Sequence, residues 1–264
     1  MVLPLKSITT KQMKYLLFLL LPVIGCQSKT STETTAQPTA PSPAPLPPNT
    51  LSEEEKAAGW ELLFDGKNTS KWRGYNKPAF PSVGWKIMDG TLAVEHSGTE
   101  EAGHGGDIIT KDKYENFELS VDFLLSDTAN SGIFYRVVEV EGEPIWHNAP
   151  EYQLLDDKRY AEMGITNLHF TAANYDLHPA EKDYTKPIGE WNTAHIIVNH
   201  NHVEHRLNGH LVVAYDLESP EWEALVAKSK FKDYPRYGRT RNGHLGLQDH
   251  GHLVLFRNIK VRRL

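Results

Sequence analysis

The segment at residues 150–157, PEYQLLDD, places on one strand two kinds of group that can do chemistry on a sugar, carboxylates and a side-chain amide. In an extended strand Glu151 and Gln153 share one face, while Tyr152 and Leu154 share the other. We therefore expect the apolar pair to pack into a core and the polar pair to face a substrate. Any half-solvated antiparallel sheet shows the same alternation, so an ordinary solvated face is the alternative.

Two further segments carry polar residues on one strand face in the same way. Residues 130–136 and 246–251 both alternate, and Leu247 is expected to point inward. Polar side chains from three strands, together with aromatic rings that stack on pyranose faces, would build a sugar site on a sheet. The outward residues are Asn130, Gly132, Phe134 and Arg136, then Gln248 and His250, and the candidate rings are Trp72, Trp85, Trp146 and Trp191.

The elements that must position these residues are short strands separated by turns. Asn208-Gly209 predicts a two-residue type I′ hairpin turn, because both residues tolerate positive φ. Only residues 52–59, where Ser52 and Glu55 form a capping-box pattern, and residues 220–230 look helical. We therefore predict an all-β sandwich or jelly roll. Clear alternation predicts strands at residues 118–124, 131–137, 195–199, 202–207, 210–215 and 253–259.

Composition and charge exclude several classes of protein. The chain of 264 residues has 19 glycines, 16 prolines and 10% aromatic residues, which suits a turn-rich β-domain better than a helical bundle. The formal net charge of −6 argues against nucleic acid as a partner, because phosphate binding needs clustered Lys and Arg. Cys26 is the only cysteine of the sequence, so no disulfide is expected within the domain.

The N-terminal residues have the pattern of an export signal. Three lysines precede a short apolar run, and Val23-Ile24-Gly25-Cys26 resembles a bacterial lipobox. This predicts removal of residues 1–25, a lipid on the Cys26 sulfur and a membrane-anchored, exported lipoprotein of the outer membrane or periplasm. The alternative is a plain secretory peptide with an incidental cysteine. Residues 26–50, rich in Thr and Pro, are expected to be a tether, and residues 51–264 the folded domain.

A series of motifs spread over the domain carries a resemblance to one family. In order, they are WELLFDGK at 60–67, WKIMDGTL at 85–92, GDIIT at 106–110, YENFEL at 114–119, NSGIFYR at 130–136, EYQLLD at 151–156, EHRLNG at 204–209, GLQDHG at 246–251 and FRNI at 256–259. In this order and spacing the chain resembles the 3-keto-disaccharide hydrolase family, formerly called domain of unknown function 1080. The resemblance implies a concanavalin A-like jelly roll and the cleavage of glycosides oxidised at C3, by hydrolysis or by 1,2-elimination.

Chemistry on a 3-keto sugar suits these residues better than ordinary glycoside hydrolysis does. A C3 ketone acidifies the hydrogen on C2, so a base can remove it, an enolate forms and the C1 leaving group departs. Such a site needs one base, one group that stabilises the enolate oxygen and one acid for the leaving oxygen. A two-carboxylate glycosidase is disfavoured, because Gln153 stands where the laminarinase-type motif Glu-x-Asp-x-x-Glu has its aspartate.

The resemblance also implies which residues form the site. The base is either Glu151 or His205, and the sequence leaves this choice open. Asp156 is set apart, because its strand parity places it on the core side. The implied catalytic residues are Glu151, His205, His250 and Arg136, and the implied substrate-binding residues are Gln153, Gln248, Asn130, Asp107 and Trp146.

Thirteen histidines raise the question of a metal, and two non-enzymatic functions remain as alternatives. His200 and His202 fit a solvated polar face, whereas a divalent ion at His205, Glu151 or His250 would assist enolate formation as a Lewis acid. A surface lectin would use the same fold and polar face without turnover. A cell-surface adhesion module would make use of the tether and the lipid anchor alone.

Overall fold

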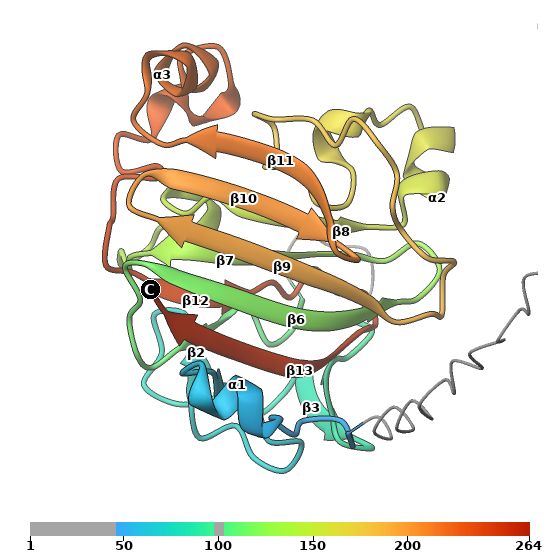
Figure 1. Ribbon diagram of the computed structural model, residues 1–264. Helices are drawn as coiled ribbons and strands as arrows, with labels where there is room; N and C mark the ends of the chain where they lie inside the picture. Colours follow the sequence, from blue (N-terminus) through green and yellow to red (C-terminus); the bar gives the residue numbers. More distant parts are fainter. Residues whose placement is uncertain (1–45, 98–102) are drawn as a thin grey trace, which may run out of the picture. The chain divides into compact units, whose positions relative to one another are not determined.

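The computed structural model describes residues 46–97 and 103–264, all of which belong to one compact unit (Figure 1). Its framework is a pair of antiparallel sheets. The larger sheet has the order β11 (His210–Asp216), β10 (His202–Leu207), β9 (Asn192–Asn199), β6 (Phe117–Leu125), β13 (Val254–Arg263), β4 (Thr91–Val94) and β3 (Trp85–Met88), with β1 (Glu61–Leu62) paired to β13. The smaller sheet has the order β2 (Trp72–Gly74), β5 (Ile108–Thr110), β12 (His244–Leu247), β7 (Asn130–Val137) and β8 (Glu151–Leu155).

The main core lies between the two sheets. Along β6 the buried and partly exposed residues alternate over all nine positions, because one face of this strand packs inward and the other meets solvent. Phe117, Val121 and Phe123 of β6 and Ile133 and Tyr135 of β7 are all fully buried in this core. The predicted concanavalin A-like jelly-roll sandwich is therefore confirmed.

The outer face of the smaller sheet is also covered. Strands β7 and β8 are buried at almost every position, unlike β6. A second apolar cluster, formed by Ile109, Phe134, Val137, Ile145 and Ala149, packs on this outer face. Two of its members come from the loop with the short 3₁₀ helix η1 (Ile145–His147), which leads into β8. Loops thus enclose this face, and a buried site can form there.

Local signals in the sequence are confirmed at several places. Helix α1 (Glu53–Ala57) begins at Ser52 with the expected capping box, and α3 (Pro220–Val226) begins with proline. Asn208 and Gly209 join β10 to β11 with φ values of 51° and 84°. Helix α2 (Asp157–Glu162) was not expected; Asp156 is its N-cap, accepting from Arg159 N, so this side chain stabilises a helix end. The remaining 3₁₀ helices are η2 (Asn167–His169) and η3 (Lys230–Asp233).

The domain begins slightly before its expected boundary. Asn49 exchanges hydrogen bonds with Asn258 of β13, at 2.6 and 2.8 Å, so it is part of the folded body. The export signal, Cys26 and most of the expected tether lie outside the described residues. Among the helices of residues 46–97 and 103–264, none is long and apolar enough to cross a membrane.

Candidate functional site

Glu151 is the buried carboxylate on the outer face of the smaller sheet. Its side chain lies over Gly132 of the neighbouring strand, so closely that a Cβ at Gly132 would stand 2.0 Å from Glu151 Oε1. Tyr152, the next residue, points the opposite way into the main core, as strand parity predicts. Gly132 therefore provides the space that this carboxylate occupies.

The environment of Glu151 favours its protonated form. The residue is 6% exposed, and burial raises the pKa of its carboxyl to about 8. The charge of Lys230 opposes this rise in pKa, and the charge of Asp107 adds to it. A carboxyl that titrates close to neutral pH can take up and release a proton during a reaction, which a surface carboxylate with an ordinary pKa does less effectively.

Two glutamines stand on the same outer face with hydrogen-bonding capacity to spare. Gln153 Nε2 donates to Asn130 Oδ1 at 3.1 Å, which links β8 to β7. The Oε1 atoms of Gln153 and Gln248 are buried and accept no hydrogen bond from the described part of the chain. Because buried polar atoms are normally paired, these two oxygens can accept hydrogen bonds from water or from the hydroxyl groups of a ligand.

Asp107 borders the candidate site at the start of β5. It immediately precedes β5, and its Oδ1 accepts a hydrogen bond from Asp249 N at 3.1 Å. Burial and the nearby Asp249 carboxylate raise the pKa of Asp107 to about 7. Glu151 and Asp107 are thus two carboxyl groups with raised pKa values, and the charge of Asp107 contributes to the rise at Glu151.

Lys230 is the residue of this region that the sequence did not reveal. It begins η3, almost 80 positions after Glu151, and its ammonium lies 4.6 Å from the Trp146 ring centre and 4.4 Å from that of Tyr175. The Trp146 ring thus contacts a cation of the same chain. No motif marked Lys230, because only the fold brings this turn to β8.

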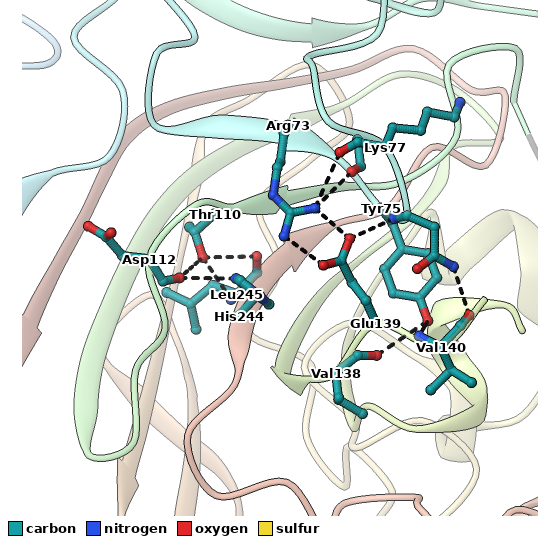
Figure 2. A network of polar contacts seen from close by, with 12 residues as sticks. Arg73, Tyr75, Lys77, Thr110, Asp112, Val138, Glu139, Val140, His244 and Leu245 are labelled. Atoms are coloured by element: carbon teal, nitrogen blue, oxygen red, sulfur yellow. Dashed lines mark hydrogen bonds and ion pairs between the residues drawn. The ribbon is translucent and has the colours of Figure 1, made fainter.

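A polar network fixes the loop that leads into β8 (Figure 2). The Tyr75 hydroxyl donates to Val138 O and accepts from Val140 N, both at 3.3 Å, and it also accepts from Asn148 Nδ2 at 3.2 Å. Beside it, Arg73 forms a two-point ion pair with Glu139, which lowers the pKa of this glutamate. The network ties β2 to residues 138–148 and so holds Trp146 and Glu151 in place.

His205 does not lie with Glu151. It is 0% exposed in the main core, so the two candidates for the base lie apart. Its Nδ1 donates to Ala172 O at 3.0 Å, so its Nε2 accepts from the Tyr135 hydroxyl at 2.9 Å. Burial lowers the pKa of His205 to about 3. Both ring nitrogens are engaged within the protein, and the ring is a neutral core residue.

Arg136 also turns into the sandwich rather than to the outer face. The register between β7 and β12 shifts at this point, and Arg136 has a φ of 58°, which marks a β-bulge that reverses the expected parity. Its guanidinium donates to His200 O and Gly238 O. Arg136 is 1% exposed and binds main-chain carbonyls, away from Glu151.

His250 follows β12, and its ring stacks on that of His252 at a centroid distance of 5.8 Å. Within the described ranges, no three His, Cys, Asp or Glu side chains are grouped so as to hold a metal ion. The proposed donors His205 and Glu151 lie on opposite faces of the smaller sheet, so they do not fit one metal ion together.

A cavity of about 730 Å³ lies beyond the end of β8, away from Glu151. Three of its carboxylates already accept main-chain hydrogen bonds: Asp156 from Arg159 N, Asp157 from Thr171 N and Asp183 from Thr185 N. These bonds shape α2 and the adjoining loops. The buried amide oxygens of Gln153 and Gln248, which accept no hydrogen bond from the described residues, lie instead on the face of Glu151, and we place the candidate site there.

Comparison with known proteins assigns the chain to a group of sugar-processing proteins. The model of the 3-keto-alpha-glucoside-1,2-lyase-like domain matches residues 59–262. A 3-keto-disaccharide hydrolase of Bacteroides thetaiotaomicron is 40% identical over 231 residues, which is 79% of each chain. Two crystal structures from Parabacteroides distasonis, both provisionally assigned as glycosyl hydrolases, are 33% and 28% identical, with TM-scores of 0.75 and 0.59. They cover 83% and 78% of this chain, which covers 100% and 99% of theirs.

Proposed function

The chain belongs to the 3-keto-alpha-glucoside-1,2-lyase-like domain family, and from this premise we propose that it cleaves glycosides oxidised at C3. It is a glycoside-cleaving enzyme with a carbohydrate substrate. For the mechanism, we propose that cleavage starts with removal of the C2 proton, after which the C1 leaving group departs. The observation that carries it is the buried Glu151 carboxyl, whose pKa of about 8 suits a base that works near neutral pH.

Glu151 takes the role of base in this proposal. Of the two candidates, His205 has both nitrogens engaged in the core, whereas Glu151 lies on the face with unused acceptors. Once its carboxylate has accepted the C2 proton, negative charge develops on the C3 oxygen as the enolate forms. The amides of Gln153 and Gln248 are placed to bind sugar hydroxyls, which would hold C2 beside the carboxylate.

Asp107 is the proposed acid for the leaving group. Its pKa of about 7 leaves a large protonated fraction at neutral pH, and a protonated carboxyl can donate to the departing C1 oxygen. Burial raises the pKa values of both carboxyl groups to near neutral, so each can exchange a proton at that pH, one as base and one as acid. If water then adds to the product of elimination, the net reaction is hydrolysis and the enzyme is a hydrolase. If water does not add, the net reaction is 1,2-elimination and the enzyme is a lyase.

The test is cleavage of matched sugars by the purified protein. 3-Keto-trehalose and 3-keto-β-glucosides are compared with the same sugars unoxidised, with and without a chelator. We expect release of the leaving group from the keto forms alone. Binding of the unoxidised glycans without cleavage of any keto sugar would contradict the proposal and favour a lectin.

We also propose that the enzyme acts outside the cytoplasm on a lipid anchor at Cys26. This rests on the lipobox-like residues 23–26 and the Thr- and Pro-rich segment after them. Metabolic labelling with a fatty-acid analogue is expected to mark the wild-type chain and to leave C26A unmarked. Equal labelling of both chains would remove this proposal.

A further inference from the structure

Lys230 is held by the same two segments that hold Glu151. The Trp146 ring, which its ammonium contacts, belongs to the loop that leads into β8. The ammonium also contacts the Tyr175 ring, and the main-chain N of Tyr175 donates to Glu151 O at 3.1 Å. Lys230 itself is exposed, and its charge acts on the buried Glu151 carboxyl. Cation–π contacts with two rings fix the position of the ammonium.

Several charged or titratable groups face Glu151 from the elements around it. Lys230 of η3 brings a positive charge, and Asp107 at the start of β5 brings a negative one. Tyr237, which packs on Phe231 of η3, has a neutral hydroxyl within reach of the Glu151 charge. Asp176 accepts a hydrogen bond from Lys230 N at 3.5 Å, and Lys77 acts on Asp107. Lys230 is thus the cation that acts on Glu151 directly.

We propose that Lys230 is a positioning residue for the reaction: its ammonium, held between the Trp146 and Tyr175 rings, stabilises the ionised Glu151 carboxylate and so keeps this base active near neutral pH. This inference rests on the function proposed above. It also gives Trp146 a role, since the ring holds the lysine as well as bordering the site. Without this cation the ionised fraction of Glu151 at neutral pH would be smaller still, and less of the enzyme could accept the C2 proton.

The direct test is the pKa of the Glu151 side chain, measured by NMR on protein labelled with carboxyl-¹³C glutamate. E151Q identifies the signal by its disappearance. In K230M we expect the pKa of Glu151 to rise by about one unit, and in K230R to return to the wild-type value. K232M is the matched control, because Lys232 is exposed in the same turn, and it should leave the pKa unchanged. An unchanged Glu151 pKa in K230M would overturn the inference.

Activity provides a second readout. At pH 7 we expect kcat/KM of K230M on a 3-keto-glucoside to fall about tenfold relative to wild type, because one unit of pKa lowers the ionised fraction of Glu151 tenfold. Above pH 9, where Glu151 is ionised in both proteins, the difference from wild type should close. A uniform loss at every pH would mean a merely structural role and would also overturn the inference. The NMR result stands apart from the substrate: if the wild type cleaves no keto sugar and the pKa shift is nevertheless found, the proposed function fails while the coupling of Lys230 to Glu151 holds.

Discussion

Buried polar side chains lie against both faces of the smaller sheet, and the two groups differ in how their hydrogen bonds are used. On the inner face, His205 of the facing strand β10 is bonded through both nitrogens, and the hydroxyl of Tyr152 in β8 donates to Arg206 O at 3.1 Å. On the outer face, Glu151 has a raised pKa, and the amide oxygens of Gln153 and Gln248 have no partner among the described residues.

The inner face, where the polar groups of His205 and Tyr152 are bonded, supports the fold, whereas the outer face has groups available for chemistry. A saturated polar network makes a core specific, and every atom in it has a partner that would be lost on mutation. Unused acceptors beside a carboxyl with a shifted pKa lower stability unless a ligand completes them, which is typical of functional sites. The family resemblance pointed to His205, whereas its bonding shows that it supports the fold.

The largest expected effect is on activity at the outer face. E151Q should lower kcat/KM on a 3-keto-glucoside by about 100- to 10,000-fold, the range for loss of a general base. Its free energy of unfolding at pH 8 should not fall, because a neutral amide replaces a buried carboxyl. Steady-state kinetics and urea unfolding measure both quantities, with E115Q as an exposed control. Activity close to wild type in E151Q would abolish the distinction between the two faces.

The inner face should give the opposite result. H205A leaves Tyr135 and the Ala172 carbonyl without their partner in the core, so the free energy of unfolding should fall by about 2–4 kcal/mol. The kcat of the molecules that remain folded should stay close to that of wild type. H202A, on the exposed side of the same strand, is the control for stability. Loss of kcat in stably folded H205A would return this histidine to the reaction.

Gly132 allows the outer face to be changed without removing any polar group. G132A places a methyl group where the Glu151 carboxylate lies, and displacement of the carboxylate by about 1 Å should lower kcat/KM about 100-fold. G246A on β12 is the matched control, because its nearest neighbour would be Ile145 Cδ1 at 3.1 Å. The measurement is kcat/KM of G132A and of G246A. Equal values in the two variants would show that the position of the Glu151 carboxylate is unimportant.

The pH dependence of stability gives a smaller effect with a definite sign. Because the folded state raises the pKa of Glu151 from 4.5 to about 8, folding favours the protonated form. The resulting stabilisation is complete below pH 4.5 and is lost as pH rises through 8. Urea unfolding between pH 5 and 9 should show a shallower decline in E151Q than in wild type. Asp107 contributes a decline of the same sign in both proteins. Parallel curves would mean that Glu151 has an ordinary pKa.

The smallest effect is expected at the support of the site. Y75F removes a hydroxyl that binds Val138 and Val140 (Figure 2) and also Asn148. The loss should cost about 0.5–1.5 kcal/mol in the free energy of unfolding. Thermal unfolding measures this loss, and KM should rise more than kcat falls, because the loop with Trp146 loosens. A change in kcat alone would contradict the supporting role.

Strand parity and turn chemistry predicted the local geometry where the chain obeys simple rules. Tyr152 and Leu154 pack inward, and Glu151 and Gln153 face outward, because an unbroken strand alternates. The position of Arg136 was not predictable, since a single bulge reverses its direction. Lys230 and the inner location of His205 depend on which segments the fold brings together, and alternation within one segment does not contain this information. Parity placed Gln248 on an outward face, and the family resemblance added Asp107, which parity on its own could not link to β8.

The most direct test of the account is the fate of the C2 hydrogen. A 3-keto-glucoside deuterated at C2 is incubated with wild type and with E151Q, and NMR follows loss of the label together with release of the leaving group. We predict that wild type loses deuterium in step with the leaving group and that E151Q does neither above the rate in buffer. Release of the leaving group while deuterium stays at C2, or full activity of E151Q, would contradict the assignment of Glu151 as the base.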